Sequence, residues 1–410
     1  MLSFWLSLAI LAVMLALDAA WWLAVLRLTR RRRWRVLMSL FMEAQIAAVL
    51  SILAAHDWLD RAPKAVVVAV ILWHHLGLML VAAILLPLSL VGVCAWMARV
   101  RTRLTGIGAG QVRRTPGQEP AVPVKPNALS RREFLGATTA LAPAVFTVGL
   151  TGVALPQLNQ FRVRRFELPL PALPRDLDGM TIAHVSDLHV GPFTKGRVLR
   201  DLVKATNALR ADLVLMTGDL IHYELADLAE GLDLVKAMPG RYGQWMIEGN
   251  HDLFEDPAEF ERRVRASGVP FLRDESAVTL VRGRPVQFFG LGWQDDNSAA
   301  GVRRSGQWLR AMMRQRHPDA FPILLAHHPH AFDAASAADL PLTLSGHTHG
   351  GYLMLDPRHG VGPVLFRYWS GHYQRGNSHL IVSNGVGNGF PLRINAPAEI
   401  VHLTLRRAAT

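Results

Sequence analysis

Aspartate, asparagine and histidine residues follow several short apolar runs in the second half of this chain. The positions in question are Asp187, His189, Asp219, Asn250, His251, His327, His347 and His349. In an α/β sheet the loops after the strands converge on one edge, so five separate loops would bring these side chains together. A single Asp or His is usually an ordinary surface residue, but Gly249-Asn250-His251-Asp252 and Gly346–Gly351 are rare combinations by composition. The pattern therefore predicts a site rather than chance placement.

These side chains offer a mixed set of metal ligands: two carboxylates, one amide oxygen and at least four imidazoles. Such a set is typical of Mn, Fe or Zn, whereas Ca²⁺ takes only oxygen ligands and structural zinc usually takes cysteine. Seven ligands are too many for one ion and favour two divalent metal ions that share a bridging carboxylate. Two such ions can hold a hydroxide that attacks phosphorus in line. The expected chemistry is phosphoester hydrolysis.

The same residues resemble the signature of the calcineurin-like metallophosphoesterases. That signature consists of Asp-x-His, Gly-Asp, Gly-Asn-His-Asp, a histidine at a strand end and Gly-His-Thr-His, and the resemblance covers residues 180–405. The segments Gly385–Gly387, Pro391–Arg393 and Pro397–Ile400 are similar to the bacterial membrane-associated branch, which includes UDP-2,3-diacylglucosamine hydrolase-like phosphodiesterases. The resemblance implies an α/β domain made of two packed mixed β-sheets flanked by helices.

The resemblance also implies a role for each motif residue. The ligands of the first metal would be Asp187, His189 and His349, those of the second would be Asn250, His327 and His347, and Asp219 would bridge the two ions. His251 resembles the general acid that protonates the leaving oxygen, with Asp252 orienting its ring. His327 is chosen because the predicted strand ends there, and His328 stays open as the alternative ligand.

Alternating strands and helices must position these residues. Short apolar runs bounded by turn residues predict strands, and runs with helical spacing between them indicate an α/β core. The predicted strands are 181–185, 212–216, 244–247, 277–281, 286–289, 323–326, 342–344 and 380–382, and the predicted helices are 198–209 and 225–237. The region is long enough for one domain with its own core.

The N-terminal part of the chain predicts a membrane region. Of the 410 residues, half are hydrophobic and only 19% are charged. Apolar runs long enough for a helix to cross a hydrocarbon core of about 30 Å fall at 1–26, 36–55, 65–97 and 135–155. The expected division is a transmembrane region at 1–100, a Gly- and Pro-rich linker at 101–129, a fourth span at 130–158, and a metallophosphoesterase domain at 159–410.

The arginines around these runs predict the orientation of the chain. The cluster between Arg27 and Arg35 places the first loop in the cytoplasm by the positive-inside rule. If 65–97 crosses once, as a tilted or kinked helix, the domain after Leu155 emerges outside. Ser130–Leu135 resembles a twin-arginine export signal, although two arginines are also an ordinary flank of a membrane helix. The expected location is the bacterial inner membrane, multi-pass, with a periplasmic catalytic domain.

The net charge of +12 does not predict a nucleic-acid-binding protein. Residues 1–165 carry 19 Lys and Arg against 6 Asp and Glu, which leaves 25 basic and 26 acidic residues in the rest. A nucleic-acid-binding domain needs a basic face on the folded domain itself. Arg162, Arg164 and Arg165 lie on the expected outer flank of the last span, where they oppose the positive-inside rule. The single cysteine, Cys94, excludes a disulfide framework and a Cys-based zinc site.

The sequence thus predicts a membrane-anchored dinuclear-metal phosphoesterase. Its substrate would carry a phosphodiester, phosphomonoester or pyrophosphate bond, in a lipid or lipid-linked molecule at the bilayer. A binding-only domain would normally have lost a ligand, and none is missing from the motifs. Tyr352 stands where the family often has Gln, but this position is outside the ligand set.

Two alternatives stay open. The resemblance implies the hydrolysis of UDP-2,3-diacylglucosamine in lipid A biosynthesis, which requires a cytoplasmic active site and conflicts with the predicted orientation. A membrane transport or sensing protein with an accessory esterase domain is the other alternative, since Asp18, Glu43 and His74 fall inside predicted spans. Four spans without repeats make a poor transporter.

Overall fold

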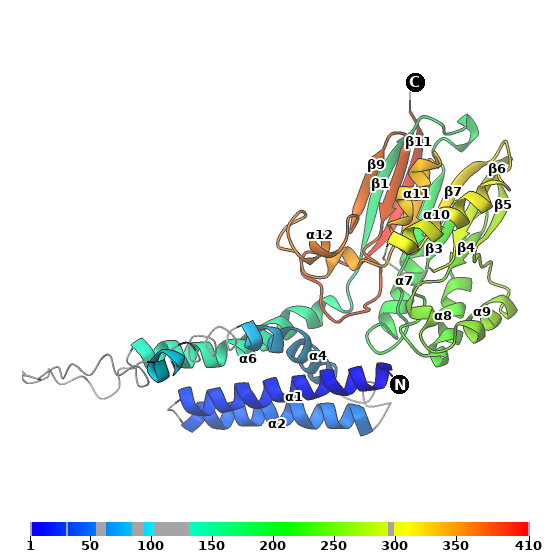
Figure 1. Ribbon diagram of the computed structural model, residues 1–410. Coiled ribbons are helices and arrows are strands. Elements are labelled where there is room, and N and C mark those ends of the chain that lie inside the picture. The colour runs from blue at the N-terminus through cyan, green and yellow to red at the C-terminus, as the bar shows by residue number, and fades with distance from the viewer. Residues whose placement is uncertain are drawn as a thin grey trace, which may run out of the picture. The chain divides into compact units, whose positions relative to one another are not determined.

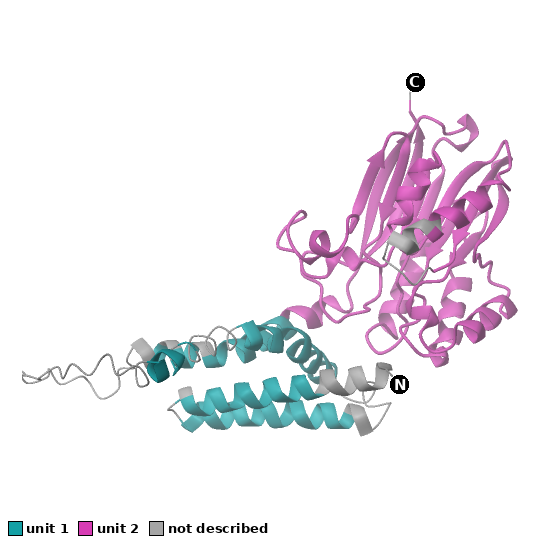
Figure 2. Ribbon diagram, viewed as in Figure 1, with its two compact units in different colours: residues 1–152 teal, residues 153–410 magenta. Residues whose placement is uncertain are grey.

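The computed structural model describes residues 2–29, 32–54, 63–83, 94, 96–101, 131–293 and 299–408. The chain divides into two compact units, residues 1–152 and 153–410 (Figure 2). Each unit has a hydrophobic core of its own. The predicted linker at 101–129 lies almost wholly outside the described residues, as does Ser130 of the twin-arginine-like motif.

The first unit is helical (Figure 1). Its helices are α1 (Leu2–Leu28), α2 (Arg32–Ala54), α4 (Lys64–Leu72) with the π-helical turn η1 (Trp73–Gly77), and the larger part of α6 (Arg131–Gln157). Among the described residues, three stretches are long and apolar enough to cross a membrane: Arg32–Ser51, Lys64–Ala83 and Ala140–Gln157. The first predicted run forms α1, and the end of the run at 65–97 falls partly outside the described residues.

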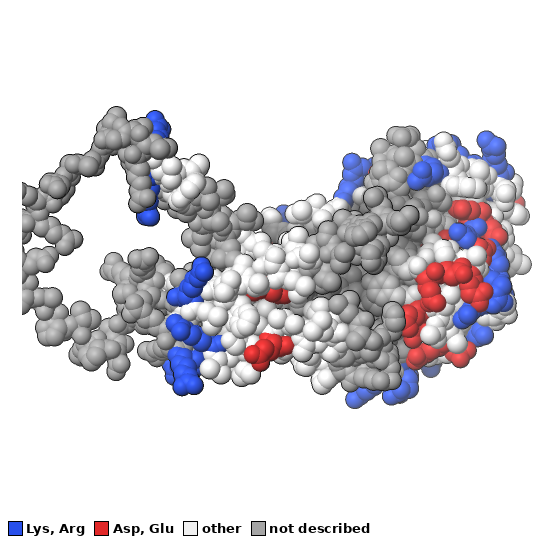
Figure 3. Space-filling model, turned by 60° about the horizontal axis from the view of Figure 1, so that its bottom comes forward, with Lys and Arg blue, Asp and Glu red and all other residues white. Residues whose placement is uncertain are grey.

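Polar residues inside this unit are paired between helices. Trp73 Nε1 donates a hydrogen bond to Asp18 Oδ1 at 2.8 Å, and His74 Nε2 lies 3.5 Å from Asp18 Oδ2. Large apolar side chains such as Leu23, Leu40 and Val145 are exposed on the outside. Figure 3 shows a helical surface that is mostly uncharged, with Lys and Arg gathered at one end. Outward apolar and inward polar residues are typical of helices that pack in a bilayer.

The second unit contains two mixed β-sheets. Across the first sheet the strands are β1 (Arg162–Leu170), β11 (Glu399–Arg407), β2 (Thr181–Val185), β3 (Leu213–Thr217) and β4 (Gln244–Ile247). Across the second they are β5 (Glu275–Val281), β6 (Arg284–Leu291), β7 (Phe321–Ala326), β8 (Leu342–Ser345), β10 (Ser378–Val382) and β9 (Gly371–Arg375). Strands β2 to β4 are parallel to one another, as are β6 to β8 and β10.

Alternating side chains on these strands build the layers of the domain. Ile182 on β2 and Ile323 on β7 point into a core between the two sheets, whereas Ala183 and Leu324, their neighbours in sequence, point outward. Helices α7 (Arg197–Ala208), α8 (Leu228–Lys236) and α9 (Pro257–Ala266) cover the outer face of the first sheet. Helices α10 (Ala299–Met313) and α11 (Ala331–Ala337) cover that of the second.

Short helical segments complete the domain. They are η2 (Arg175–Leu177), η3 (Leu225–Asp227), η4 (His251–Leu253), η5 (His349–Gly351) and α12 (Val361–Leu365). The predicted fold class, apolar helices followed by an α/β domain with two mixed sheets, is confirmed. The eight predicted strands correspond to β2 to β8 and β10, whereas β1, β9 and β11 were not predicted. Helices α9 to α11 were also not predicted.

Candidate metal centre

The candidate ligands lie in the loops that follow five strands of the two sheets. Asp187 and His189 follow β2, Asp219 follows β3, and Asn250 follows β4. In the second sheet, His327 follows β7, and His347 and His349 follow β8. All these loops lie at carboxyl ends of parallel strands, so the packed sheets bring their side chains to one end of the domain.

Five of these residues have a left-handed backbone that non-glycine residues rarely adopt. They are Asp187 (φ 55°), His189 (φ 46°), Asp219 (φ 54°), His347 (φ 71°) and His349 (φ 48°). Hydrogen bonds between loops hold this conformation: the His189 amide donates to the Asp219 carbonyl at 3.0 Å, and the His347 amide donates to Asp187 Oδ1 at 2.9 Å. Interlocked loops thus maintain a strained arrangement that aims the ligands inward.

Two glycines allow the loops of the site to pack closely against the carboxylates. A Cβ atom at Gly249 would overlap the Asp219 carboxylate, and a Cβ atom at Gly346 would overlap Ser186 and Asp187. Only glycine therefore lets these two loops approach the carboxylates so closely. This explains why the Asn250 and His347 motifs each begin with glycine.

Four of the side chains form a first buried cluster. Their ligand atoms all lie within 4.8 Å of one another, and the members are Asp187, His189, Asp219 and His349. His189 Nε2 lies 3.0 Å from His349 Nε2 and 3.5 Å from Asp219 Oδ2. His349 Nε2 lies 3.5 Å from Asp187 Oδ1. The cluster matches the set predicted for the first metal, together with the predicted bridge.

A second cluster contains Asp219, His327 and His347. His327 Nε2 lies 3.1 Å from Asp219 Oδ2, and His347 Nδ1 lies 2.9 Å from Asn250 Oδ1. Asp219 therefore belongs to both clusters, as a bridging carboxylate must. The structure brings His327 into this cluster and leaves His328 outside the ligand clusters found among the described residues.

The His327 ring shows that the site fits a cation. Its Nδ1 lies 2.6 Å from the Thr217 carbonyl, so Nδ1 carries a proton and Nε2 of the neutral ring presents a lone pair. Nε2 is buried and lacks a well-formed hydrogen bond, although it faces the Asp219 carboxylate. Burial opposes a charge on this ring, yet Asp219 and Asp187 together raise the pKa of His327 to about 9. The two acceptors therefore require a proton or a metal ion between them.

Burial keeps the other imidazoles uncharged. Burial lowers the pKa of His189 and His349 well below the usual range, and lowers the pKa of His347 to about 3. Burial raises the pKa of Asp187 to about 6, because its negative charge loses the stabilisation of water. Neutral imidazoles and a destabilised carboxylate favour a divalent cation.

His251 lies beside the two clusters. Its amide donates to Asp219 Oδ1 at 2.8 Å, and its Nδ1 lies 2.7 Å from the His222 carbonyl. Asp252 does not orient this ring as was predicted. Its carboxylate instead accepts hydrogen bonds from the amides of Ile221 at 3.0 Å and Gly249 at 2.8 Å. Asp252 thus ties the loop after β3 to the loop after β4.

Comparisons with known proteins agree with this geometry. A family model described as calcineurin-like phosphoesterase matches residues 180–351. The uncharacterized metallophosphoesterase YkuE of Bacillus subtilis (strain 168) is 30% identical over 298 residues, which cover 68% of this chain and 98% of that protein. The chain belongs to the calcineurin-like phosphoesterase family. Its assignment as a metallophosphoesterase with a buried His and Asp site is confirmed.

The name of a second relative mentions a transmembrane part as well as a metallophosphoesterase domain. The transmembrane protein with metallophosphoesterase domain of Danio rerio is 30% identical over 269 residues, which cover 63% of this chain and 60% of that protein. The solved dimetal phosphatase of Danio rerio aligns at 13% identity with a TM-score of 0.33, over 51% of this chain and 88% of that one. The names of these relatives do not support the finer resemblance to UDP-2,3-diacylglucosamine hydrolases.

Two further residues support the site of this metallophosphoesterase, and sequence reasoning gave neither of them a role. His222 forms a third histidine cluster with His189 and His251, and its Nδ1 lies 3.5 Å from His189 Nδ1. In the sequence, His222 stands three residues after Asp219, the predicted bridging residue, and this spacing is the signal that could have indicated it. Because His222 is buried, its pKa is lowered to about 3.

Arg393 is the second such residue. It is buried, and its Nη2 donates to His349 Nδ1 at 3.0 Å while its Nη1 donates to the Asn384 carbonyl at 2.9 Å. A guanidinium can only donate, so His349 Nδ1 accepts, and the neutral ring carries its proton on Nε2. In the sequence, Arg393 belongs to Pro391–Arg393, a segment that indicated only a resemblance to the membrane-associated branch of the family.

Proposed function

We propose that this protein is a membrane-anchored phosphoesterase that hydrolyses a phosphoester or phosphoanhydride bond with two divalent metal ions. The position of Asp219 in both ligand clusters is the observation that carries this proposal. Family membership supports the reaction class. Mn, Fe and Zn all suit a site of carboxylate, amide and imidazole ligands.

The protein residues have distinct roles in this reaction. Bound metal ions would supply Lewis acidity and an activated nucleophile. Asp187, His189, Asp219 and His349 would hold one ion, and Asp219, Asn250, His327 and His347 would hold the other. The carbonyls of Thr217 and His222 fix the rings of His327 and His251, so that Nε2 of each ring is left for chemistry.

His251 would act as the general acid. Its Nδ1 is committed to the His222 carbonyl, so Nε2 is the atom that can deliver a proton to the leaving oxygen. The hydrogen bond from its amide to Asp219 keeps this loop beside the bridging carboxylate. A proton donor in this position matters most when the leaving oxygen is a poor leaving group.

Membrane anchorage gives the substrate class that we propose, a lipid or lipid-linked phosphate. The three apolar helical stretches and a relative named as a transmembrane protein support the anchorage. Helix α6 ends at Gln157 and β1 begins at Arg162, so the domain follows the last candidate span after a short connection. We further propose that the domain lies on the outer face, as the arginine distribution predicts.

Replacement of the bridging carboxylate tests this function. The full-length protein, purified in detergent and loaded with Mn²⁺, should hydrolyse bis-p-nitrophenyl phosphate, and its metal content should be two ions per chain. Asp219→Asn should lower activity by at least 100-fold together with metal content, because the amide cannot bridge two cations. Asp233→Asn, an exposed control on α8, should retain both. Two ions retained by Asp219→Asn would contradict the bridging role.

A further inference from the structure

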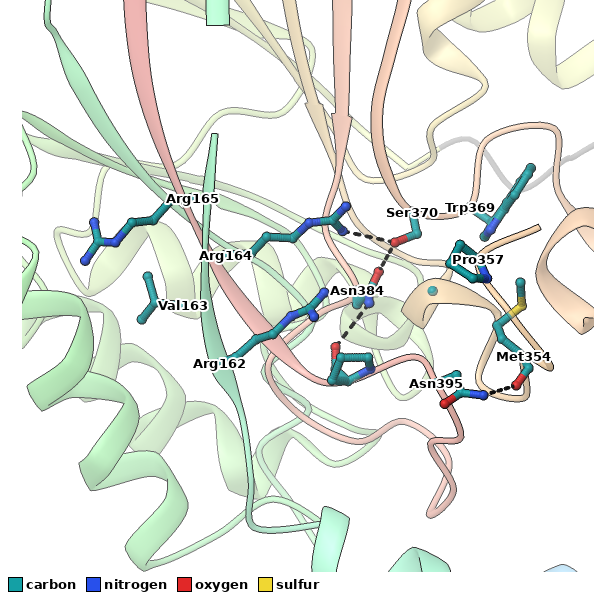
Figure 4. Close-up of a pocket in the computed structure, with 12 residues that line it drawn as sticks. Arg162, Val163, Arg164, Arg165, Met354, Pro357, Trp369, Ser370, Asn384 and Asn395 are labelled. Carbon is teal, nitrogen blue, oxygen red and sulfur yellow. Dashed lines mark hydrogen bonds between the residues drawn. The ribbon is translucent and has the colours of Figure 1, made fainter. Parts of the chain in front are cut away.

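The second unit has a cavity beside the start of β1 that differs from the metal centre in its lining residues (Figure 4). Its volume is about 580 Å³. Its lining residues include Arg162, Arg164 and Arg165 of β1, together with Ser370 and Asn384. Within the part of the chain that the structure describes, its lining residues include neither a carboxylate nor any of the metal ligands. The cavity is therefore suited to an anion.

Two of the three arginines that line this cavity are only partly neutralised. Arg162 Nη2 lies 2.8 Å from Glu399 Oε2, and Arg164 Nη1 lies 3.4 Å from Glu399 Oε1. Two guanidinium groups thus share one carboxylate, which leaves an excess of one positive charge. The Glu399 side chain is fully buried, whereas 48% of the Arg162 side chain and 30% of the Arg164 side chain are exposed. The exposed parts of both groups remain available to a ligand.

Neighbouring groups fix one of these arginines at the cavity. Arg164 Nη1 donates to Ser370 Oγ at 3.3 Å, and Ser370 Oγ donates to Asn384 Oδ1 at 2.6 Å. The side chain of Arg165, the next residue on β1, extends to the other side of the strand (Figure 4). Its Nη1 lies 2.8 Å from His402 Nδ1. Pre-positioned guanidinium groups pair well with the oxygens of a phosphate.

The place of these arginines in the chain indicates a source for that phosphate. Arg162 comes five residues after Gln157, where α6 and its candidate membrane span end. Five extended residues reach at most about 17 Å, so a membrane-spanning α6 would keep Arg162 close to the bilayer surface. Anionic lipid headgroups attract basic side chains at this depth. Binding of a lipid phosphate would also explain why these arginines lie on the predicted outer flank of the span, where the positive-inside rule disfavours them.

We propose that this cavity is a second phosphate-binding site, separate from the metal centre, for the headgroup phosphate of an anionic phospholipid. The lipid source rests on the membrane anchorage proposed above, whereas the phosphate chemistry rests on the cavity alone. Free inorganic phosphate has the same chemistry and is the alternative source. The variants of the cavity arginines distinguish binding here from binding at the metal centre, so failure of this site and failure of the proposed hydrolysis can be told apart.

Calorimetric titration of the metal-loaded, full-length protein in detergent tests the site. The titrants are dihexanoyl phosphatidylglycerol, zwitterionic dihexanoyl phosphatidylcholine and inorganic phosphate. Phosphatidylglycerol should bind at least about tenfold more tightly than phosphatidylcholine, because the cavity carries net positive charge. Binding of inorganic phosphate at this site without binding of the lipid would overturn the lipid source. Absence of binding by all three would overturn the site.

Variants assign the binding to the cavity. Arg164→Gln should weaken phosphatidylglycerol binding about tenfold, as expected for a lost charge-assisted hydrogen bond. Arg200→Gln removes the same charge from an exposed position on α7 that does not line the cavity, so this variant should bind phosphatidylglycerol as the wild type does. Equal affinities of these two variants would overturn the proposal.

Arg164→Gln weakens the pairing of a buried carboxylate and could therefore impair folding. A further variant, at Glu399, tests the site by an expected gain in affinity. Glu399→Gln keeps the shape of the side chain and removes the competing negative charge. It should bind phosphatidylglycerol several-fold more tightly, because both arginines are then free for the ligand. Weaker or unchanged binding would count against a shared anion site.

Discussion

The pair of His327 and Asp219 illustrates how single residues determine the behaviour of the metal centre. Without a metal ion, burial opposes a charge on His327, but Asp219, Asp187 and the Thr217 carbonyl together raise its pKa to about 9 and hold a proton on the ring. Proton and metal ion therefore compete for the same position. The metal affinity should therefore depend on pH through His327, although the ordinary pKa of a histidine is only 6.5.

The first prediction concerns this competition. Below about pH 9 a metal ion must displace the proton of His327, so the apparent association constant should rise about tenfold per pH unit between pH 7 and 8.5. Calorimetric titration of the metal-free protein with Zn²⁺ in buffers of different ionisation enthalpy would measure the released protons. A pH-independent affinity with no proton release would contradict it.

A second prediction separates proton donation from metal binding. His251→Ala should lower turnover of an alkyl phosphodiester by about 100-fold or more, whereas a p-nitrophenyl ester, with its good leaving group, should be affected much less. Metal content should stay at two ions, because His251 is not among the proposed ligands. Equal losses on both substrates would argue against a general acid, and loss of metal would indicate a structural role.

The motif residues of the site could be predicted because their chemistry shows in short sequence patterns. Their supporting residues could not be predicted in the same way. Arg393 reaches His349 from a segment 44 positions away, and the partner of His251 is a main-chain carbonyl. Asp252 was expected to orient His251, but its carboxylate lies against two amides of the neighbouring loops. Such contacts depend on the tertiary fold.

At the scale of elements, the strands that were predicted are those with continuous apolar runs. Strand β1 is a mixture of arginine and apolar residues and contains Pro169. An edge strand tolerates this composition, and among the described strands β1 pairs with β11 alone. Helix α9 begins at a signal that was overlooked: Asp256 accepts hydrogen bonds from the Ala258 and Glu259 amides, and Pro257 occupies the first turn. The β1–β11 pair joins distant parts of the chain, which local patterns do not reveal.

Strand β2 supports a third prediction, about stability. His184 alternates with Ala183 and therefore faces the core between the sheets, where its Nε2 lies 2.8 Å from Thr217 Oγ1 and its Nδ1 has no hydrogen-bond partner. Burial lowers its pKa from 6.5 to about 3. The unfolded chain thus binds a proton between pH 6.5 and 3 that the folded protein does not bind. Stability is full above pH 6.5 and falls as the pH is lowered through this window.

A comparison of the wild type with a variant should reveal how much His184 contributes to the pH dependence of stability. The free energy of unfolding in urea should fall by about 1.4 kcal/mol more per pH unit in the wild type than in His184→Leu, between pH 6 and 4. Other buried histidines affect both proteins equally and cancel in the comparison. Parallel pH profiles would show that His184 is not buried in a neutral form.

At the scale of the whole molecule, the fourth prediction is the side of the membrane on which the C-terminus lies. If the arginine cluster near α2 is cytoplasmic and the spans alternate, Thr410 lies outside. Alkaline phosphatase fused after Thr410 should then be active, and a fluorescent protein that folds only in the cytoplasm should be dark. The reverse pattern would place the metal centre in the cytoplasm and change the available lipids.

The short connection between α6 and β1 has a further consequence for the kinetics of such an enzyme. If α6 spans the bilayer as we propose, a domain attached by four residues would sample a thin layer beside one leaflet, and substrates embedded there would meet it at a high effective concentration. Molecules in bulk solution gain nothing from this attachment. Turnover of a membrane-resident substrate should follow its surface density in the bilayer, whereas its amount per volume of suspension should matter little. The short connection would then favour lipid substrates over soluble ones without contacting either.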